Sequence, residues 1–177
     1  MIQRRYLSVS SVLLILALAC SLSVAKTAKQ STPGISNFHK TADGIYRGGA
    51  PSNTGLKTLK TMGIRTIIDL RGFSTPAKQE KKSAESMGFR WVNLPMGKAA
   101  PTTKQVSTFL AVLAKAPDEP VFVHCQYGAD RTGCMIGIYR VKVQGWSFAK
   151  AWAEMRAYGF KPWLSELKNA VRSRAAS

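Results

Sequence analysis

The sequence predicts an α/β fold, with one domain built on a central, mostly parallel sheet of four to five strands flanked by helices. Twice along the chain a helical stretch stops at a glycine, Gly63 or Gly88, and a β-branched or aromatic stretch follows directly. The apolar run VFVHC at residues 121–125 is typical of a strand buried on both faces, and residues 131–143 after it are apolar nearly all round, as in a buried helix. Helices alternating with strands favour a parallel sheet.

The first 25 residues are predicted to be an export signal. Arg4 and Arg5 precede an uncharged stretch with the apolar centre VLLILALA, and SVA at residues 23–25 has the small side chains that signal peptidases require. We expect cleavage after Ala25 and a periplasmic or secreted protein. An uncleaved membrane anchor is an alternative because the run approaches spanning length. A lipoprotein attached at Cys20 is another, although the residues before this cysteine match a lipoprotein box poorly.

The rest of the chain is predicted to be a flexible lead over residues 26–37 and one domain over residues 38–177, expected to be a monomer. The chain has 177 residues and a net charge of +17, and removal of Arg4 and Arg5 with the signal leaves +15. Such a charge attracts phosphorylated substrates, nucleic acids or acidic lipids. No zinc-finger spacing or aromatic-basic repeat accompanies it, which argues against nucleic acid. Membrane contact is expected only through the N-terminal segment.

The first elements are expected in this order. GIYRGGAPS, residues 44–52, indicates a brief strand and a turn. Leu56, Leu59 and Met62 mark a helix that ends before a strand in IRTIIDLRG, residues 64–72. A second helix over residues 79–87 precedes a strand in FRWVNLP, residues 89–95.

The later elements carry clear end signals. Thr102 and Gln105 form a capping box for a helix that the segment 117–120, with a proline at each end, interrupts before the central strand. After the buried helix, Ser147 is expected to cap another helix. A last short helix is predicted around Trp163, Leu164 and Leu167, with its apolar side chains in the core.

Ten residues, HCQYGADRTG at 124–133, join the predicted central strand to the buried helix. Ligands of open α/β sheets bind beyond the carboxyl ends of the strands, and a helix N-terminus offers free N–H groups to an anion. The spacing from Cys125 to Arg131 lets the backbone curl inward, and Arg131 offers a planar fork that matches two phosphate oxygens. We name residues 125–131 the Cys125 loop. The residues expected to bind phosphate are Gln126, Tyr127, Gly128, Ala129, Asp130 and Arg131.

Cys125 is predicted to be a nucleophile. The helix end, the inward amides and Arg131 all favour its thiolate, and such settings lower a cysteine pKa from about 8.5 to about 4 to 7. The other interpretation, a small buried hydrophobic residue, does not account for the glycines and the arginine around it. Without the signal only Cys125 and Cys134 remain, so neither a disulfide scaffold nor a zinc site is expected, and no metal or cofactor is predicted. Cys134 is expected to be a core thiol, and a reversible disulfide between the two cysteines stays open.

The pattern H-C-x5-R-[ST]-G resembles the signature of cysteine-based phosphatases of the tyrosine and dual-specificity type. GIYRGGAPS, TIIDLRG and VKVQGWSFAKAWAEMRAYGF are similar to small bacterial, often exported, members of that group, so the resemblance covers roughly residues 38–168. It implies a phosphatase P-loop and hydrolysis of phosphotyrosine, and of phosphoserine or phosphothreonine, in a protein or a small molecule. Alternatives are an inositol phosphate or phosphoinositide phosphatase and a catalytically weak phosphate-binding module.

The resemblance implies a role for each residue of the motif. Cys125 would attack phosphorus and form a cysteinyl-phosphate, while Arg131 and the loop amides would stabilise the equatorial oxygens. Thr132 would hydrogen-bond the sulfur as it leaves. His124 would orient the loop from beneath.

The general acid departs from the family pattern, because no aspartate lies between Gly72 and Pro117, where the only carboxylates are Glu80 and Glu85. Asp130 is the first choice for the acid, with bracing of Arg131 or the loop backbone as the alternative. The subgroup with the loop H-C-x-x-G-K-D-R-T-G has a similar aspartate, but Ala129 replaces its lysine, which weakens a specific prediction of phosphoinositides.

Other candidates lie outside the loop. Asp69, with Arg71 beyond it, is also a candidate for the acid, but it is rather expected to be a structural brace or a substrate contact. Asp118 is the weakest choice for the acid, since it enters the central strand at its far end, about 20 Å from the cysteine. Arg47 is expected either to contact substrate or to be an ordinary surface arginine.

Overall fold

The computed structural model of the chain describes residues 32–175, so the predicted export signal and residues 26–31 of the predicted lead lie outside the described residues. The described part contains five strands and six helices. In chain order they are β1 (His39–Ala42), β2 (Ile45–Gly48), α1 (Asn53–Thr61), β3 (Thr66–Asp69), α2 (Thr75–Ser86), β4 (Arg90–Asn93), α3 (Thr103–Leu113), β5 (Val121–His124), α4 (Asp130–Lys142), α5 (Phe148–Ala157) and α6 (Ser165–Arg172).

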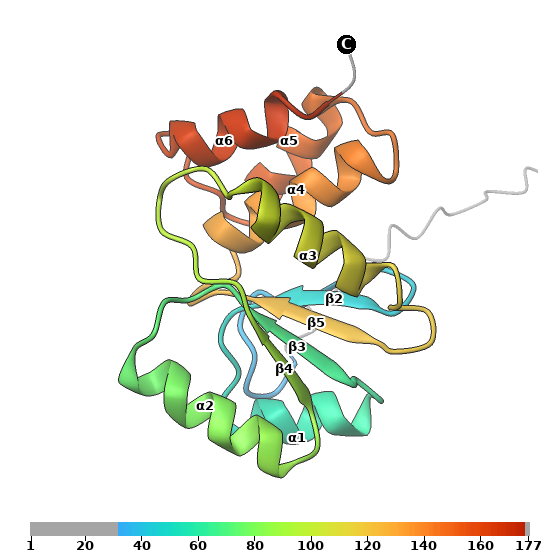
Figure 1. The fold of residues 1–177 in the computed structure, drawn as a ribbon, viewed down its shortest axis with the longest axis vertical. Helices are drawn as coiled ribbons and strands as arrows, with labels where there is room; N and C mark the ends of the chain where they lie inside the picture. The colour runs from blue at the N-terminus through green and yellow to red at the C-terminus, as the bar shows by residue number, and fades with distance from the viewer. Residues whose placement is uncertain (1–31, 176–177) are drawn as a thin grey trace, which may run out of the picture. The chain divides into compact units, whose positions relative to one another are not determined.

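The strands form one sheet in the order β1-β2-β5-β3-β4 (Figure 1). β1 is antiparallel to β2, and the other three pairings are parallel. β5 lies in the centre, as the run VFVHC predicts, and all four of its residues are buried. The predicted α/β class and mostly parallel sheet are therefore confirmed.

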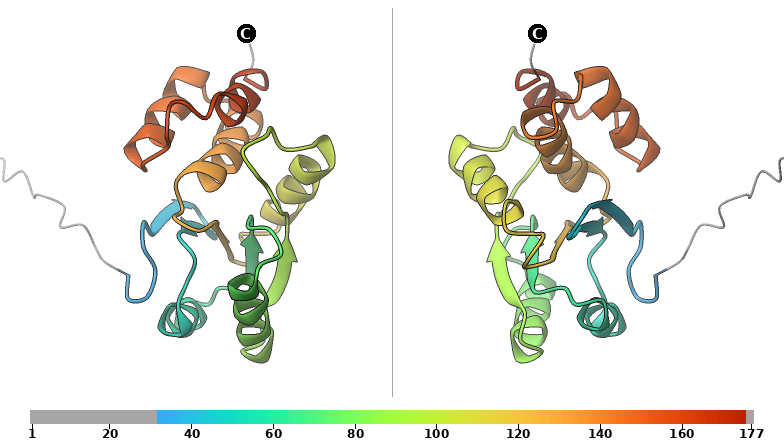
Figure 2. Two further views of the ribbon diagram at one scale, coloured as in Figure 1. Left: turned by 90° about the vertical axis from the view of Figure 1, so that its left-hand side faces the viewer. Right: turned by 90° about the vertical axis from the view of Figure 1, so that its right-hand side faces the viewer.

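Helices cover both faces of the sheet: α1 and α2 lie on one side and α3 to α6 on the other (Figures 1 and 2). The side chains of neighbouring residues in a strand point to opposite faces of the sheet. Ile67 and Phe122 pack with Leu56 and Leu59 of α1, whereas Ile68 belongs to the larger cluster on the side of α3 to α6. α4 is buried on nearly all sides beneath its neighbours, as its uniformly apolar sequence predicts.

The parallel pairing brings the carboxyl ends of four strands to one edge of the sheet. Gly48 of β2 and Asp69 of β3 are both register partners of His124, the last residue of β5, and Asn93 of β4 is the partner of Asp69. The Cys125 loop begins at this edge. Ligand sites of open α/β sheets lie at such an edge, so the sheet places the loop where a ligand is expected.

The predicted helix ends are present. Gly63 and Gly88 have φ values of 78° and 81°, which favour glycine, and each ends a helix before a strand. Thr102 and Gln105 form the reciprocal hydrogen bonds of a capping box, and Ser147 accepts from the backbone N–H of Lys150.

Three features differ from the sequence predictions. Residues 32–37, expected to be part of a flexible lead, are packed: Thr32 pairs with Ile35, and the Ile35 side chain is only 6% exposed. α2 begins at Thr75 instead of residue 79, because a proline in its first turn needs no hydrogen-bonding partner. Trp163, expected in the core, is 73% exposed.

Among the described residues, no helix combines the length and the apolar character needed to cross a membrane.

Candidate active site

The Cys125 loop packs directly against the end of β2. Gly128 has a φ of 67°, and a Cβ atom there would lie 2.6 Å from the backbone nitrogen of Gly49 and closer still to Gly48. The backbone N–H of Ala50 donates to the carbonyl oxygen of Gln126 at 3.2 Å. The missing side chain of Gly128 thus lets the loop approach the backbone at the end of β2, and β2 and the loop support each other.

Cys125 lies at the base of the loop and is 2% exposed. Burial raises the pKa of its thiol, but hydrogen bonds from the side chain and backbone of Thr132, the charge of Arg131 and the N–H of Tyr127 together outweigh burial and lower that pKa below 9.0. Thr132 Oγ1 is buried and has no other hydrogen-bond partner among the described residues, so its hydroxyl is available to the sulfur. The surroundings therefore favour a thiolate, which is the nucleophilic form of cysteine.

Arg131 is the second residue of α4 and is partly exposed. Its Nη1 lies 3.5 Å from the carbonyl oxygen of Met96, in the segment after β4. The guanidinium is therefore held beside the loop by one weak contact, which leaves most of its hydrogen-bond donors for an anion.

Asp130, the first residue of α4, contacts a different partner from the ones expected. Its Oδ1 accepts from the backbone N–H of Lys161 at 2.8 Å, and its Oδ2 lies 4.0 Å from Lys161 Nζ. The carboxylate therefore braces the segment between α5 and α6 instead of Arg131 or the loop backbone. Its side chain stays 18% exposed, and the ammonium of Lys161 is the one charged group within 4.0 Å of Oδ2 among the described residues.

Arg47 is neither a surface arginine nor exposed enough to bind substrate, so both expectations are wrong. It is 1% exposed, and its Nη2 donates to the carbonyl oxygen of Gly128 at 2.7 Å. Its guanidinium also lies over the ring of Tyr158 and 4.0 Å from a carboxylate oxygen of Glu154. Burial lowers the pKa of Arg47 to about 10, so the side chain is still charged at neutral pH.

Asn37 makes a contact with the loop that the sequence did not predict. Its side-chain amide donates to the carbonyl oxygens of Tyr127, at 3.3 Å, and Tyr158, at 3.0 Å. Its φ is 51°, a conformation that asparagine adopts more readily than most residues. The segment before β1 thus ties the Cys125 loop to the end of α5.

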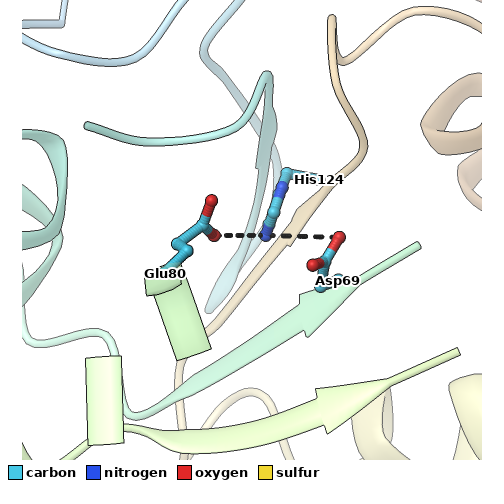
Figure 3. A group of neighbouring side chains, drawn as sticks. All are labelled: Asp69, Glu80 and His124. Carbon is cyan, nitrogen blue, oxygen red and sulfur yellow. Dashed lines mark ion pairs between the residues drawn. The ribbon is translucent and has the colours of Figure 1, made fainter. Parts of the chain in front are cut away.

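A buried ionic cluster lies beneath the loop. Arg71 donates to both carboxylate oxygens of Asp69, at 2.8 to 3.2 Å through its backbone and side chain, and to Glu80 Oε2 at 2.6 Å. Glu80 Oε1 lies 3.0 Å from His124 Nε2, and Asp69 Oδ1 lies 3.9 Å from the same atom (Figure 3). Asp69 and Arg71 are 0% and 6% exposed, so the structure supports the brace and not the substrate contact.

Glu80 was the residue missed in this cluster. The sequence shows it only as a carboxylate on a helix, and nothing near it in the chain indicates that α2 brings it to His124. Asp69, Glu80 and His124 offer donor atoms within 4.8 Å of one another, as a metal site would. However, the guanidinium of Arg71 pairs with both carboxylates, so an arginine already supplies positive charge where a metal ion would.

The remaining candidates are far from the loop or inert. Asp118 is exposed in the segment before the first residue of β5, at the opposite edge of the sheet. Glu85 is exposed and pairs with Lys81 at 3.8 Å. Cys134 is fully buried in α4, and burial raises the pKa of its thiol to about 12, as expected of a core thiol.

Comparisons with known proteins agree with this geometry. The family model described as "DSP-PTPase phosphatase fused to NAD+ Kinase" matches residues 22–173. The chain is 33% identical over 143 residues to inositol diphosphatase DSP3 of Arabidopsis thaliana, covering 78% of this chain and 70% of that protein. It is 27% identical over 147 residues to the dual specificity protein phosphatase TpbA of Pseudomonas aeruginosa, covering 78% of this chain and 65% of that protein.

Solved structures share the fold. The crystal structure of P. aeruginosa TpbA superposes with a TM-score of 0.68 at 23% identity, covering 81% of this chain and 87% of that one. The core catalytic domain of the PP-IP phosphatase SIW14 from S. cerevisiae gives a TM-score of 0.69 at 22% identity, covering 80% and 86%.

Proposed function

Because this chain belongs to the DSP-PTPase phosphatase family, we propose that it hydrolyses phosphate monoesters through a covalent intermediate on Cys125. One observation carries the proposal. Cys125 is almost completely buried, yet Thr132, together with Arg131 and the N–H of Tyr127, lowers the pKa of its thiol below the ordinary value. Desolvation alone would keep a thiol protonated, so the loop stabilises an anion at this position. A dianionic phosphate would meet the same donors.

The reaction has two steps. The Cys125 thiolate attacks phosphorus, and the alcohol or phenol oxygen leaves with a proton. Water then attacks the cysteinyl-phosphate, and the thiolate is released as inorganic phosphate forms. The guanidinium of Arg131 and the amides of residues 126–131 bind the equatorial oxygens in both steps. The Thr132 hydroxyl stabilises the departing thiolate in the second step, which matches its place among the groups that lower the cysteine pKa.

The proton for the leaving group comes from Asp130 in this proposal. The hydrogen bond from the backbone N–H of Lys161 to Oδ1 holds the carboxylate at the start of α4, and Oδ2, which lies 4.0 Å from Lys161 Nζ, is the oxygen that would carry the proton. Asp69 does not share the task, because it is fully buried and both of its oxygens accept hydrogen bonds from Arg71.

Phosphotyrosine, in a protein or a small molecule, is the first substrate class. The phenol that leaves has a pKa of about 10, whereas the pKa of an alcohol such as serine is much higher and closer to that of water. The one proposed acid is Asp130, and one of its oxygens already accepts a hydrogen bond from Lys161. We therefore expect faster hydrolysis of substrates whose leaving group has the lower pKa. Hydrolysis of phosphoserine and phosphothreonine should therefore be slower than hydrolysis of phosphotyrosine.

Inositol phosphates, diphosphates among them, are the second class. A phosphate that leaves from a diphosphate has a second pKa of about 6 and needs little help from an acid. This suits a chain with no aspartate between Gly72 and Pro117. A relative that is 33% identical carries the name inositol diphosphatase, and the net charge of +17 favours such polyanions.

Phosphate release by the purified chain tests both classes. A phosphotyrosine peptide, the matched phosphoserine peptide, an inositol diphosphate and the corresponding inositol monophosphate should be compared by kcat/KM, with Cys125→Ser as the inactive control. We expect turnover of the first and third substrates to exceed that of their partners by at least about tenfold. No turnover of any substrate, with phosphopeptide binding retained, would instead identify a phosphate-binding module.

We further propose that the chain is exported, on the sequence of residues 1–25 alone. Expression of the full chain in bacteria, followed by cell fractionation and N-terminal sequencing, tests this. We expect a periplasmic or secreted protein that begins at Lys26. A full-length product in the cytoplasmic fraction would contradict the proposal.

A further inference from the structure

His124 is fully buried at the end of β5, and each of its ring nitrogens faces oxygen. Nδ1 lies 3.2 Å from the carbonyl oxygen of Cys125. Nε2 lies 3.0 Å from Glu80 Oε1 and 3.9 Å from Asp69 Oδ1, and the two carboxylates approach it from opposite sides (Figure 3). The contact with Glu80 is not aligned as a hydrogen bond, so its energy depends on the charge that the ring carries.

These neighbours determine which ring nitrogens of His124 carry a hydrogen. A neutral imidazole has one nitrogen with a hydrogen and one bare nitrogen with a lone pair. A bare Nδ1 would point its lone pair at the carbonyl oxygen of Cys125, and a bare Nε2 would leave a partly negative nitrogen 3.0 Å from the carboxylate of Glu80. Either neutral form therefore places a nitrogen with a lone pair next to an oxygen. The imidazolium, with a hydrogen on both nitrogens, is attracted at both ends.

The charges around the ring support the same form. The charged groups that face it are Asp69 from β3, Arg71 from the segment after β3, and Glu80 from α2. Its ring neighbours, Trp91 on β4 and Phe122 on β5, are uncharged. Two carboxylates and one guanidinium leave one negative charge, and buried charges are tolerated when they are paired. An imidazolium completes the balance.

We propose that Glu80 is a positioning residue of the active site that acts through His124. Its carboxylate holds the ring as an imidazolium beneath the Cys125 loop. The Nδ1–H then donates to the carbonyl oxygen of Cys125, and the positive charge next to that residue favours its thiolate. The inference rests on the proposed role of Cys125 as the nucleophile, although the contacts themselves do not include the sulfur.

The protonation of His124 is tested directly by NMR. The chain has two histidines, His39 and His124, so labelling histidine with nitrogen-15 gives few signals to assign. We expect both ring nitrogens of His124 to carry hydrogen at pH 7 in the unaltered chain. A bare nitrogen in that spectrum would overturn the proposal even if no variant folds.

Glu80→Gln is the decisive variant, with Glu85→Gln as its matched control. Glutamine keeps the shape of Glu80 but removes its charge, and Glu85 lies on the same helix with an exposed side chain. In Glu80→Gln we expect His124 to lose one hydrogen at pH 7, and the pH midpoint of Cys125 alkylation to rise by about one unit. kcat should fall more than KM changes. Glu85→Gln should leave all three readouts unchanged, and an unshifted midpoint in Glu80→Gln would refute the proposal.

A double-mutant cycle separates an action through His124 from a general loosening of the fold. If Glu80 acts through the ring, Glu80→Gln should add no further shift of the alkylation midpoint to a His124→Asn chain. Additive shifts would contradict the mechanism. The NMR readout does not depend on turnover, so a chain whose Cys125→Ser variant is still active would disprove the proposed function and leave the test of Glu80 and His124 intact.

Discussion

Arg47 Nη2 donates to the carbonyl oxygen of Gly128 at 2.7 Å, so a fully buried side chain of β2 holds the Cys125 loop from inside the fold. The bond spans 81 residues of sequence and joins β2 to the loop that follows β5, the strand with which β2 pairs. The carbonyl that it anchors belongs to the residue with the left-handed backbone. In a trans peptide the C=O and N–H point in opposite directions, so the Ala129 N–H, which shares this peptide, points away from Arg47.

Arg47→Met should therefore damage stability and activity together. The change leaves the buried carbonyl of Gly128 without its charged donor, which costs about 2 kcal/mol of unfolding free energy. Glu154 keeps its contact with Arg140 at 2.8 Å, so its carboxylate still has a positively charged partner after Arg47 is replaced. Urea unfolding and kcat/KM on an aryl phosphate measure the two effects. Arg65→Met, at an exposed position two residues after Gly63, is the control and should change stability by less than about 0.5 kcal/mol.

Gly128→Ala tests whether close packing or backbone conformation matters more in the loop. Gly63 has a similar positive φ, but a methyl group added there would lie more than 4 Å from every other described residue that could block it. Gly63→Ala therefore reports conformational strain alone, about 1 to 2 kcal/mol. At Gly128 the same methyl group meets the backbone of β2, which should add about 1 to 3 kcal/mol and abolish most turnover. Equal losses of unfolding free energy in the two variants, measured in urea, would show that the loop can shift to accommodate the added methyl group.

The thiol of Cys125 should react as a thiolate below its ordinary pH range. Its pKa is lowered, so its alkylation by iodoacetamide, followed by mass spectrometry of the Cys125 peptide, should reach half its maximal rate below pH 9.0. Thr132→Val removes the hydroxyl that favours the thiolate and should raise this midpoint. Cys134 serves as an internal reference, because burial and a pKa of about 12 should keep it unmodified across the same range. A midpoint at or above 9.0 in the unaltered chain would contradict the assigned anion site.

Local signals in the sequence were sufficient for much of this fold. Gly63 and Gly88 ended their helices, and the capping box at Thr102 began another, because such signals act between residues a few positions apart. β1 was missed, since HKTA has no apolar alternation and the strand exists through its antiparallel pairing with β2. Trp163 lies outside the core because a sequence pattern shows apolar character but not whether another element covers it.

The active site likewise contains residues that the sequence predicts and partners that it does not. The loop from Cys125 to Arg131 was recognisable because its chemistry lies in consecutive residues. The partners that hold it come from elsewhere: Glu80 reaches His124 from α2, and the partner of Asp130 is a backbone N–H of Lys161. A hydrogen bond from a backbone N–H cannot be predicted from residue types. Nor does the sequence distinguish a buried helical glutamate from an exposed one, because burial depends on how the helices pack.

Asp130→Asn separates proton donation from bracing. Asparagine keeps a carbonyl oxygen that can accept from the backbone N–H of Lys161 at the position of Oδ1, so the contact between α4 and the segment before α6 is retained. If Asp130 protonates the leaving oxygen, kcat/KM on phosphotyrosine should fall by about 100-fold or more, while an activated aryl phosphate with an acidic phenol should lose much less. Lys161→Met is the control, because it removes the ammonium 4.0 Å from Oδ2 but keeps the backbone donor. Equal losses on both substrates in Asp130→Asn would assign this carboxylate to bracing alone, and diphosphates, which need no acid, would then become the favoured substrates.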